Sequence, residues 1–216
     1  MKKIILSNVG KRFGKIRVLE EVNMELYSGN IYGLIGPNGC GKTVLLKMIA
    51  GFVRATEGTV TLDGKIIGKD LDFPPSMGTL IENPGFLPSY TGMKNLYYLA
   101  KINNKIDKKG ILKAMDKVNI SYAADRKVGE YSLGMRQRLG ITQAIMENPD
   151  IILLDEPMNG LDKDGIVEIR NLLLDLKNQG KLIMLASHTQ EDIKILCDCV
   201  YRVENFKVNK EHRCIS

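Results

Sequence analysis

The sequence has no long run of apolar residues. Its most apolar stretches, 151–154 and 182–186, are far shorter than the roughly 20 residues that a membrane-spanning helix needs. The basic start, Met1-Lys2-Lys3, is followed only by Ile4-Ile5-Leu6, which is too short for the apolar region of a signal peptide. We therefore expect a cytosolic chain that does not itself cross a membrane.

Cysteine is also scarce, with four in 216 residues. So few cysteines do not suit the disulfide framework of a small secreted protein, and we expect reduced thiols. Cys197, Cys199, His212 and Cys214 are four potential zinc ligands, but their one-residue spacings fit poorly with ligand loops of about two to four residues. The pattern therefore does not favour a zinc site.

The charge balance is modest, with 31 basic and 25 acidic side chains and a net charge of +6. That value is compatible with nucleic acid, with an anionic membrane face or with solubility alone, so charge does not decide the partner. Lysines alternate with apolar residues between 101 and 118. A solvated helix face explains that pattern better than a membrane-contacting face.

Short apolar segments alternate with helical patterns, which predicts a single α/β domain over residues 1–216. Residues 150–154 and 181–186 are typical of buried parallel strands, and the apolar spacing of 163–178 predicts the helix that must connect them. A helical, lysine-rich lobe is expected to interrupt the core at about 88–132. Further strands are expected at 3–7, 16–27, 31–35 and 59–62, and a further helix at 43–50.

A glycine-rich loop carries the first chemical signal. Residues 36–43 read Gly-Pro-Asn-Gly-Cys-Gly-Lys-Thr, the eight-residue P-loop pattern, between an expected strand and an expected helix. In that context backbone N–H groups and the helix N-terminus bind nucleotide phosphates, Lys42 adds a positive charge, and Thr43 can hold Mg²⁺. The residues expected to bind ATP here are Gly36, Pro37, Asn38, Gly39, Cys40, Gly41, Lys42, Thr43 and Val44.

Two adjacent carboxylates end an apolar strand at 151–157, where the sequence reads Ile-Ile-Leu-Leu-Asp-Glu-Pro. By itself this could be a strand that ends in a solvated acidic turn. Together with the P-loop it favours a Walker B arrangement, in which Asp155 binds the magnesium and Glu156 polarises the attacking water as a general base.

The segment Tyr131-Ser132-Leu133-Gly134-Met135, followed by Arg-Gln-Arg-Leu, resembles the LSGGQ signature of ABC transporter ATP-binding subunits. The resemblance spans nearly the whole chain and keeps the family's order of motifs. It implies a P-loop NTPase (RecA-like) core with a mostly parallel sheet, an N-terminal antiparallel β subdomain and an inserted helical subdomain. It also implies ATP with Mg²⁺, a head-to-tail homodimer or a heterodimer with a related ATPase, and separate permease subunits at the inner face of the cell membrane.

The same resemblance assigns roles across the dimer. The signature across the dimer is Ser132, Leu133, Gly134 and Met135, in which Leu133 replaces the family's first glycine and Met135 its glutamine. The resemblance implies that the Ser132 hydroxyl and the Gly134 backbone N–H bind the γ-phosphate that the other subunit holds. A serine that merely caps a helix would explain Ser132 alone. Asp162 matches the D-loop, which couples the two ATP sites.

Two further residues match the family's ATP site. His188 ends an expected strand at the position of the switch histidine, so the catalytic set is Glu156, His188 and Lys42. Phe13 stands where an aromatic residue stacks on adenine, although a core position would also explain it.

Glu82 stands where the family usually has glutamine, and it completes the expected metal set of Thr43, Glu82 and Asp155. The surrounding residues, 80–88, with Thr91 and Asn95-Leu96, resemble the ATPases of bacitracin- and lantibiotic-type exporters. This resemblance implies export of a peptide antibiotic or drug.

Two other functions fit parts of the sequence. A soluble, non-transport ABC ATPase acting on the ribosome or on nucleic acid would fit the net charge, but such proteins usually need two ATPase halves or a long coiled coil, which do not fit in 216 residues. A P-loop kinase would need an acceptor site and no signature. No direct nucleic-acid contact is therefore expected.

Overall fold

The computed structural model describes residues 2–211, so His212 and Cys214 of the candidate zinc set lie outside the described residues. The described part contains two sheets, with strand orders β2-β1-β4-β5 and β10-β9-β3-β8-β7-β6. The strands are β1 Lys3–Phe13, β2 Ile16–Tyr27, β3 Ile31–Ile35, β4 Glu57–Leu62, β5 Lys65–Ile66, β6 Met77–Leu80, β7 Ile151–Asp155, β8 Leu182–Ala186, β9 Cys199–Glu204 and β10 Lys207–Glu211. The α-helices are α1 Lys42–Ile49, α2 Gly92–Asn103, α3 Lys108–Lys117, α4 Leu133–Ile145, α5 Lys163–Asn178 and α6 Gln190–Leu196.

The first sheet is antiparallel, with β1 paired to β2 on one side and to β4 on the other. β1 runs to Phe13 rather than ending at residue 7 as predicted. The register shifts between Leu6 and Val9, where Asn8 has a φ of 49° and its N–H donates to Asn23 Oδ1 at 2.9 Å. A bulge thus absorbs the irregular residue, and pairing continues beyond it.

The second sheet forms the centre of the domain and is parallel except for β10. The predicted parallel strands are confirmed in β7 and β8, which pair directly, and α5 is the predicted connection between them. The sequence prediction missed β6 because it has only four residues and includes Gly78. A Cβ on Gly78 would lie 1.7 Å from Ala144 O of α4, so a glycine is required where α4 crosses this strand.

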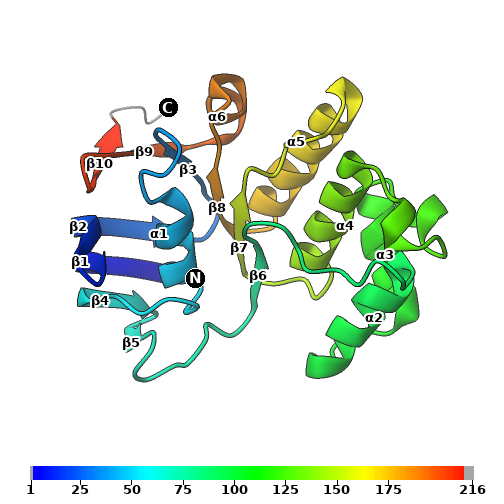
Figure 1. Ribbon diagram of the computed structural model, residues 1–216, viewed down its shortest axis with the longest axis horizontal. Helices are drawn as coiled ribbons and strands as arrows, with labels where there is room; N and C mark the ends of the chain where they lie inside the picture. The colour runs from blue at the N-terminus through cyan, green and yellow to red at the C-terminus, as the bar shows by residue number, and fades with distance from the viewer. Residues whose placement is uncertain (1, 212–216) are drawn as a thin grey trace.

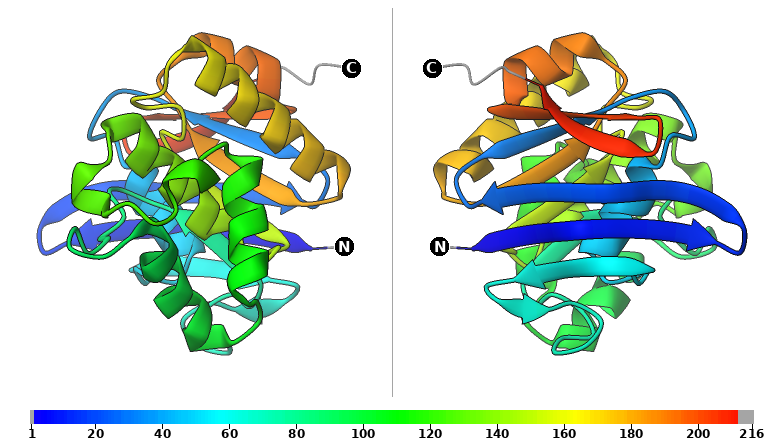
Figure 2. Two further views of the ribbon diagram at one scale, coloured as in Figure 1. Left: turned by 90° about the vertical axis from the view of Figure 1, so that its right-hand side faces the viewer. Right: turned by 90° about the vertical axis from the view of Figure 1, so that its left-hand side faces the viewer.

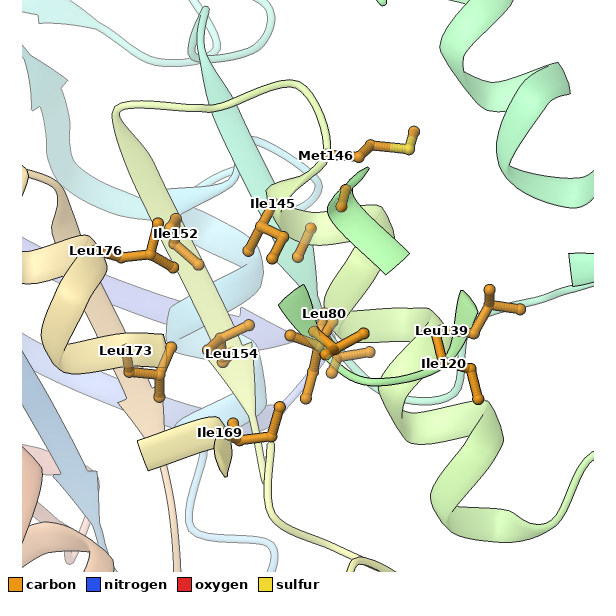
Figure 3. Packing of buried hydrophobic residues seen from close by; sticks show 14 of the residues in the cluster. Leu80, Ile120, Leu139, Ile145, Met146, Ile152, Leu154, Ile169, Leu173 and Leu176 are labelled. Carbon is orange, nitrogen blue, oxygen red and sulfur yellow. The ribbon is translucent and has the colours of Figure 1, made fainter. Parts of the chain in front are cut away.

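Figure 3 shows how the apolar residues of β6 and β7 pack between α4 and α5. Ile152 and Leu154 point from β7 into this layer and are fully buried, as are Ile169 and Leu173 of α5. This packing fixes the edge of the sheet at which β7 delivers its two carboxylates.

The helical region lies at one end of the molecule, away from the antiparallel strands (Figures 1 and 2). α2 and α3 begin with capping side chains: Thr91 accepts from Lys94 N, and Asp107 accepts from Gly110 N. Ile111 and Met115 of α3 are fully buried, whereas the lysines of this region are exposed, as expected for solvated helix faces. Between residues 2 and 211 there is no helix with both the length and the apolar character needed to span a membrane.

Candidate active site

The P-loop connects the end of β3 to the start of α1 and depends on glycine geometry. Gly36, Gly39 and Gly41 have φ values of 148°, 77° and 110°. A Cβ on Gly36 would lie 2.3 Å from Val203 O, so a side chain there would collide with β9. Gly41 has no side chain with which to cap α1, which leaves the first N–H groups of the helix able to receive an anion.

Lys42 is only 7% exposed, and its ammonium lies across the loop. Its Nζ donates to Gly36 O at 2.7 Å and to Pro37 O at 3.0 Å. A buried ammonium needs such acceptors, and a phosphate bound at the loop would offer it stronger, charged ones.

Thr43 and Asp155 are 112 residues apart in sequence, yet Thr43 Oγ1 donates to Asp155 Oδ2 at 2.6 Å. They meet because β3 and β7 flank β8 in the parallel sheet and deliver their following residues to the same edge. Burial is the main cause that raises the pKa of Asp155, and the neighbouring Glu156 charge adds to it, whereas the Thr43 hydrogen bond and Lys42 lower it. A hydroxyl and a carboxylate at this contact suit Mg²⁺, which prefers oxygen ligands.

A cavity of about 520 Å³ opens over this contact, within the size range of small-molecule sites. Nine of its lining residues were predicted: Asn38, Gly39, Gly41, Lys42, Thr43, Val44, Glu82, Asp155 and Glu156. Gly36, Pro37 and His188 line a second cavity of about 510 Å³.

Four lining residues were not predicted: Val18, Asn83, Gln137 and Asn159. Val18 comes from the antiparallel sheet, and its sequence gives no signal beyond an apolar strand. Asn83 and Asn159 each adjoin a predicted motif, so motif proximity could have indicated them.

Phe13 lies at the end of β1, outside the residues that line the 520 Å³ cavity. It is 48% exposed, so the alternative of a core position is wrong. Lys11 Nζ lies 4.6 Å from its ring centroid, a cation–π distance. Because β1 continues beyond its bulge, the Phe13 ring is exposed to solvent at the end of β1. The strand paired with β1 is β2, which carries the cavity residue Val18.

Glu156 has a φ of 49°, a left-handed conformation that is uncommon for a residue with a side chain. Its N–H donates to Ala186 O at 2.9 Å, and its Oε2 lies 2.8 Å from His188 Nδ1. Gln137 Nε2 donates to both Glu156 O and Pro157 O at 3.0 Å. Contacts from β8, α4 and the loop after β8 thus hold the unusual backbone and its carboxylate in place.

The signature residues lie outside the cavity that Lys42 and Asp155 line. Ser132 is the N-cap of α4, and its Oγ accepts from Met135 N at 3.2 Å, so Ser132 does cap this helix, as the alternative explanation expects. Leu133 is 55% exposed and packs on Gly160, where a Cβ would come within 2.6 Å of Leu133 Cγ. The signature and the D-loop therefore touch within one chain.

Asp162 caps α5 by accepting from Gly165 N at 2.9 Å.

Cys40 is half-buried, and its Sγ lies against Gly36, since a Cβ on Gly36 would be 2.9 Å from that sulfur. Glu82 lines the cavity, but its Oε1 is 2.7 Å from Lys47 Nζ of α1. Among residues 2–211 there is no cluster of three or more His, Cys, Asp and Glu side chains that could hold a metal ion.

Comparison with known proteins identifies the family. Residues 19–159 match the family model described as ABC transporter. The chain is 40% identical over 208 residues to the ABC transporter ATP-binding protein YybJ of Bacillus subtilis strain 168, covering 96% of this chain and 95% of that protein. It is 38% identical to the bacitracin transport ATP-binding protein BcrA of Enterococcus faecalis, covering 95% and 70% of the two chains.

A solved nucleotide-free ATP-binding cassette from an ABC transporter superposes with a TM-score of 0.84 at 26% identity, covering 96% of this chain and 90% of that chain. This agreement confirms the predicted fold class. The P-loop follows β3 and Asp155 ends β7 at the same edge of the parallel sheet, so both lie in the architecture of an ATP-binding cassette. The chain belongs to the ABC transporter family, as one of its ATP-binding subunits, and is an ATPase.

Proposed function

We propose that this ATPase drives the export of a peptide antibiotic or drug through separate permease subunits, at the inner face of the cell membrane. The support is its similarity to a protein named for bacitracin transport and the glutamate at position 82. The loop after Glu82, together with the helical lobe at 88–132, would pass the movement to the permease.

The ATP hydrolysis that would drive this export is supported by one observation: Thr43, Asp155 and Glu156 converge on one cavity beside the P-loop. The loop amides and Lys42 would bind the phosphates of ATP, and Phe13 would stack on the adenine. Mg²⁺ would be held by Thr43 and Asp155 with Glu82 within reach, and when bound it would neutralise charge on the phosphate oxygens.

Hydrolysis would begin at Glu156. Its carboxylate would accept a proton from the attacking water while the γ-phosphoryl group leaves the β-phosphate, giving ADP and inorganic phosphate. His188, 2.8 Å from Glu156 Oε2, would hold that carboxylate and contact the γ-phosphate.

A second subunit would complete the site. Ser132 and Gly134 lie outside their own chain's cavity, so they are free to bind the γ-phosphate held by another copy or by a related ATPase. The D-loop Asp162 would link the two sites, because its segment contacts the signature in the same chain. ATP would thereby hold a head-to-tail dimer together, and hydrolysis would open it.

The test is Glu156→Gln, with Glu204→Gln, an exposed change of the same kind, as the control. We expect the first variant to form a dimer with Mg-ATP, measured by light scattering, while phosphate release falls by at least about a hundredfold. Normal hydrolysis would remove Glu156 from its role. A variant that binds ATP but stays monomeric would exclude the shared site.

A further inference from the structure

A buried ion pair contacts the loop that carries His188. Arg170 of α5 and Asp192 of α6 form it, with Arg170 Nε and Nη2 both donating to Asp192 Oδ1, at 2.9 and 2.6 Å. The Asp192 side chain is 2% exposed and that of Arg170 is 11% exposed. Glu191 Oε1 accepts from Arg170 Nη1 at 3.2 Å at the solvent edge.

The second oxygen of Asp192 faces the loop. Asp192 Oδ2 accepts from Ser187 Oγ at 3.5 Å, and Ser187 Oγ accepts from Thr189 N at 3.1 Å. Ser187 is 2% exposed, and its backbone N–H donates to Leu34 O of β3 at 3.3 Å. Ser187, on one side of His188, thus contacts the ion pair, and Thr189, on the other side, is hydrogen-bonded to Ser187.

His188 itself is not held by burial, because its side chain is 68% exposed. Its ring contact is Glu156 Oε2, at 2.8 Å from Nδ1. Because burial does not fix this ring, its position depends on the backbone on either side, and a shift of about 1 Å at a catalytic contact can cost about a hundredfold in rate.

We propose that the Arg170–Asp192 ion pair, acting through Ser187, is the positioning element that places His188 on Glu156. Asp162 of the D-loop is the N-cap of α5, so the helix that carries Arg170 follows the D-loop directly. A movement of α5 at the dimer interface would therefore reach the His188 loop through one buried pair. The inference rests on the proposed role of His188 and adds Arg170, Asp192 and Ser187 to the residues that hydrolysis needs.

A purely structural ion pair would stabilise the fold without controlling His188, and the variants separate these cases. Asp192→Asn keeps the size of the side chain and weakens the pair, whereas Ser187→Ala leaves the pair and removes only its link to the loop. Lys177→Gln is the matched control, because Lys177 on the same helix pairs with Asp198 after α6. Thermal unfolding and ATP affinity establish that each variant is folded.

We expect Asp192→Asn and Ser187→Ala to lower kcat at least about tenfold while the Kd for ATP stays within about twofold, and Lys177→Gln to leave kcat unchanged. In a His188→Ala background, Asp192→Asn should lower kcat no further, because residues that act through one another are not additive. Equal losses in the control, or additive losses with His188→Ala, would overturn the proposal.

A second readout does not depend on activity. The chain has two histidines, so the ring signals of His188 can be assigned in NMR spectra by comparison with a His212→Gln variant. We expect these signals to shift in Asp192→Asn and Ser187→Ala and not in Lys177→Gln. Unchanged signals would refute the positioning role. Shifted signals with His188→Ala fully active would instead refute the proposed role of His188.

Discussion

Glu82 Oε1 lies 2.7 Å from Lys47 Nζ and so joins the segment after β6 to the helix that follows the P-loop. Glu82 also lines the cavity and has a φ of 59°. The Glu82 side chain is 62% exposed, so the pair contributes at most about 1 kcal/mol and is readily exchanged for another partner. Glu82 can therefore either pair with Lys47 or turn toward the site at which Mg²⁺ would bind.

This competition between Lys47 and Mg²⁺ for Glu82 predicts opposite effects for two substitutions. If Glu82 reaches the proposed Mg²⁺ site, Glu82→Gln removes a charged oxygen there, so the Mg²⁺ concentration for half-maximal ATPase activity should rise about threefold. Lys47→Met frees Glu82 from its partner, so that concentration should fall by a similar factor. Magnesium titrations of ATPase activity measure both. Shifts in the same direction would show that Glu82 does not reach the metal.

Asp155 is expected to lower the stability of the nucleotide-free protein. Burial raises its pKa from the ordinary 3.8, so the folded protein binds this proton more tightly than the unfolded chain. Stability therefore falls as the pH rises from about 3.8 to the raised pKa, and at neutral pH the buried charge is a cost.

Asp155→Asn should then raise the melting temperature at pH 7 while abolishing ATPase activity, because the neutral amide does not carry the buried charge. The gain should disappear below about pH 3.8, where the carboxyl is protonated in both states. Asp72→Asn, an exposed loop change, is the control and should not move the melting temperature. A lower melting temperature at neutral pH for Asp155→Asn would contradict the prediction.

Gln137 should be needed for turnover because it holds the backbone on either side of the Glu156–Pro157 peptide. Gln137→Leu leaves the carbonyls of Glu156 and Pro157 without their side-chain donor, at a cost of about 1–3 kcal/mol. We expect kcat to fall about tenfold or more, measured by phosphate release, with ATP binding retained. The exposed Gln179→Leu provides the same chemical change as a control. Unchanged kcat would mean that the backbone at Glu156 holds its φ of 49° unaided.

Cys40 reports directly on whether ATP occupies the P-loop. Its half-buried thiol packs on Gly36, whereas Cys197 and Cys199 are buried and serve as internal controls. ATP at ten times its Kd should slow modification of Cys40 by a thiol reagent about tenfold, measured by peptide mass spectrometry. Equal rates with and without ATP would place the nucleotide elsewhere.

The sequence by itself determined the α/β class, the parallel pair β7 and β8, and the family. These follow from local order: an apolar strand, a glycine-rich loop and a helix are adjacent in the chain, so Gly36 to Thr43 could be recognised without contacts. The same is true of Asp155 and Glu156, which end their own strand.

Only the tertiary structure decided which side chains from distant segments come into contact. The contact of Thr43 with Asp155, the hold of Gln137 on Glu156, and the attachment of the His188 loop to Arg170 all join segments that are distant in sequence. Strand order and helix packing set these distances, because side chains meet only where the sheet brings their strands to one edge. The bounds of β6 and β1 likewise depended on neighbouring elements. Gly78 in β6 is explained by the crossing of α4, and Asn8 in β1 is explained by the bulge opposite β2.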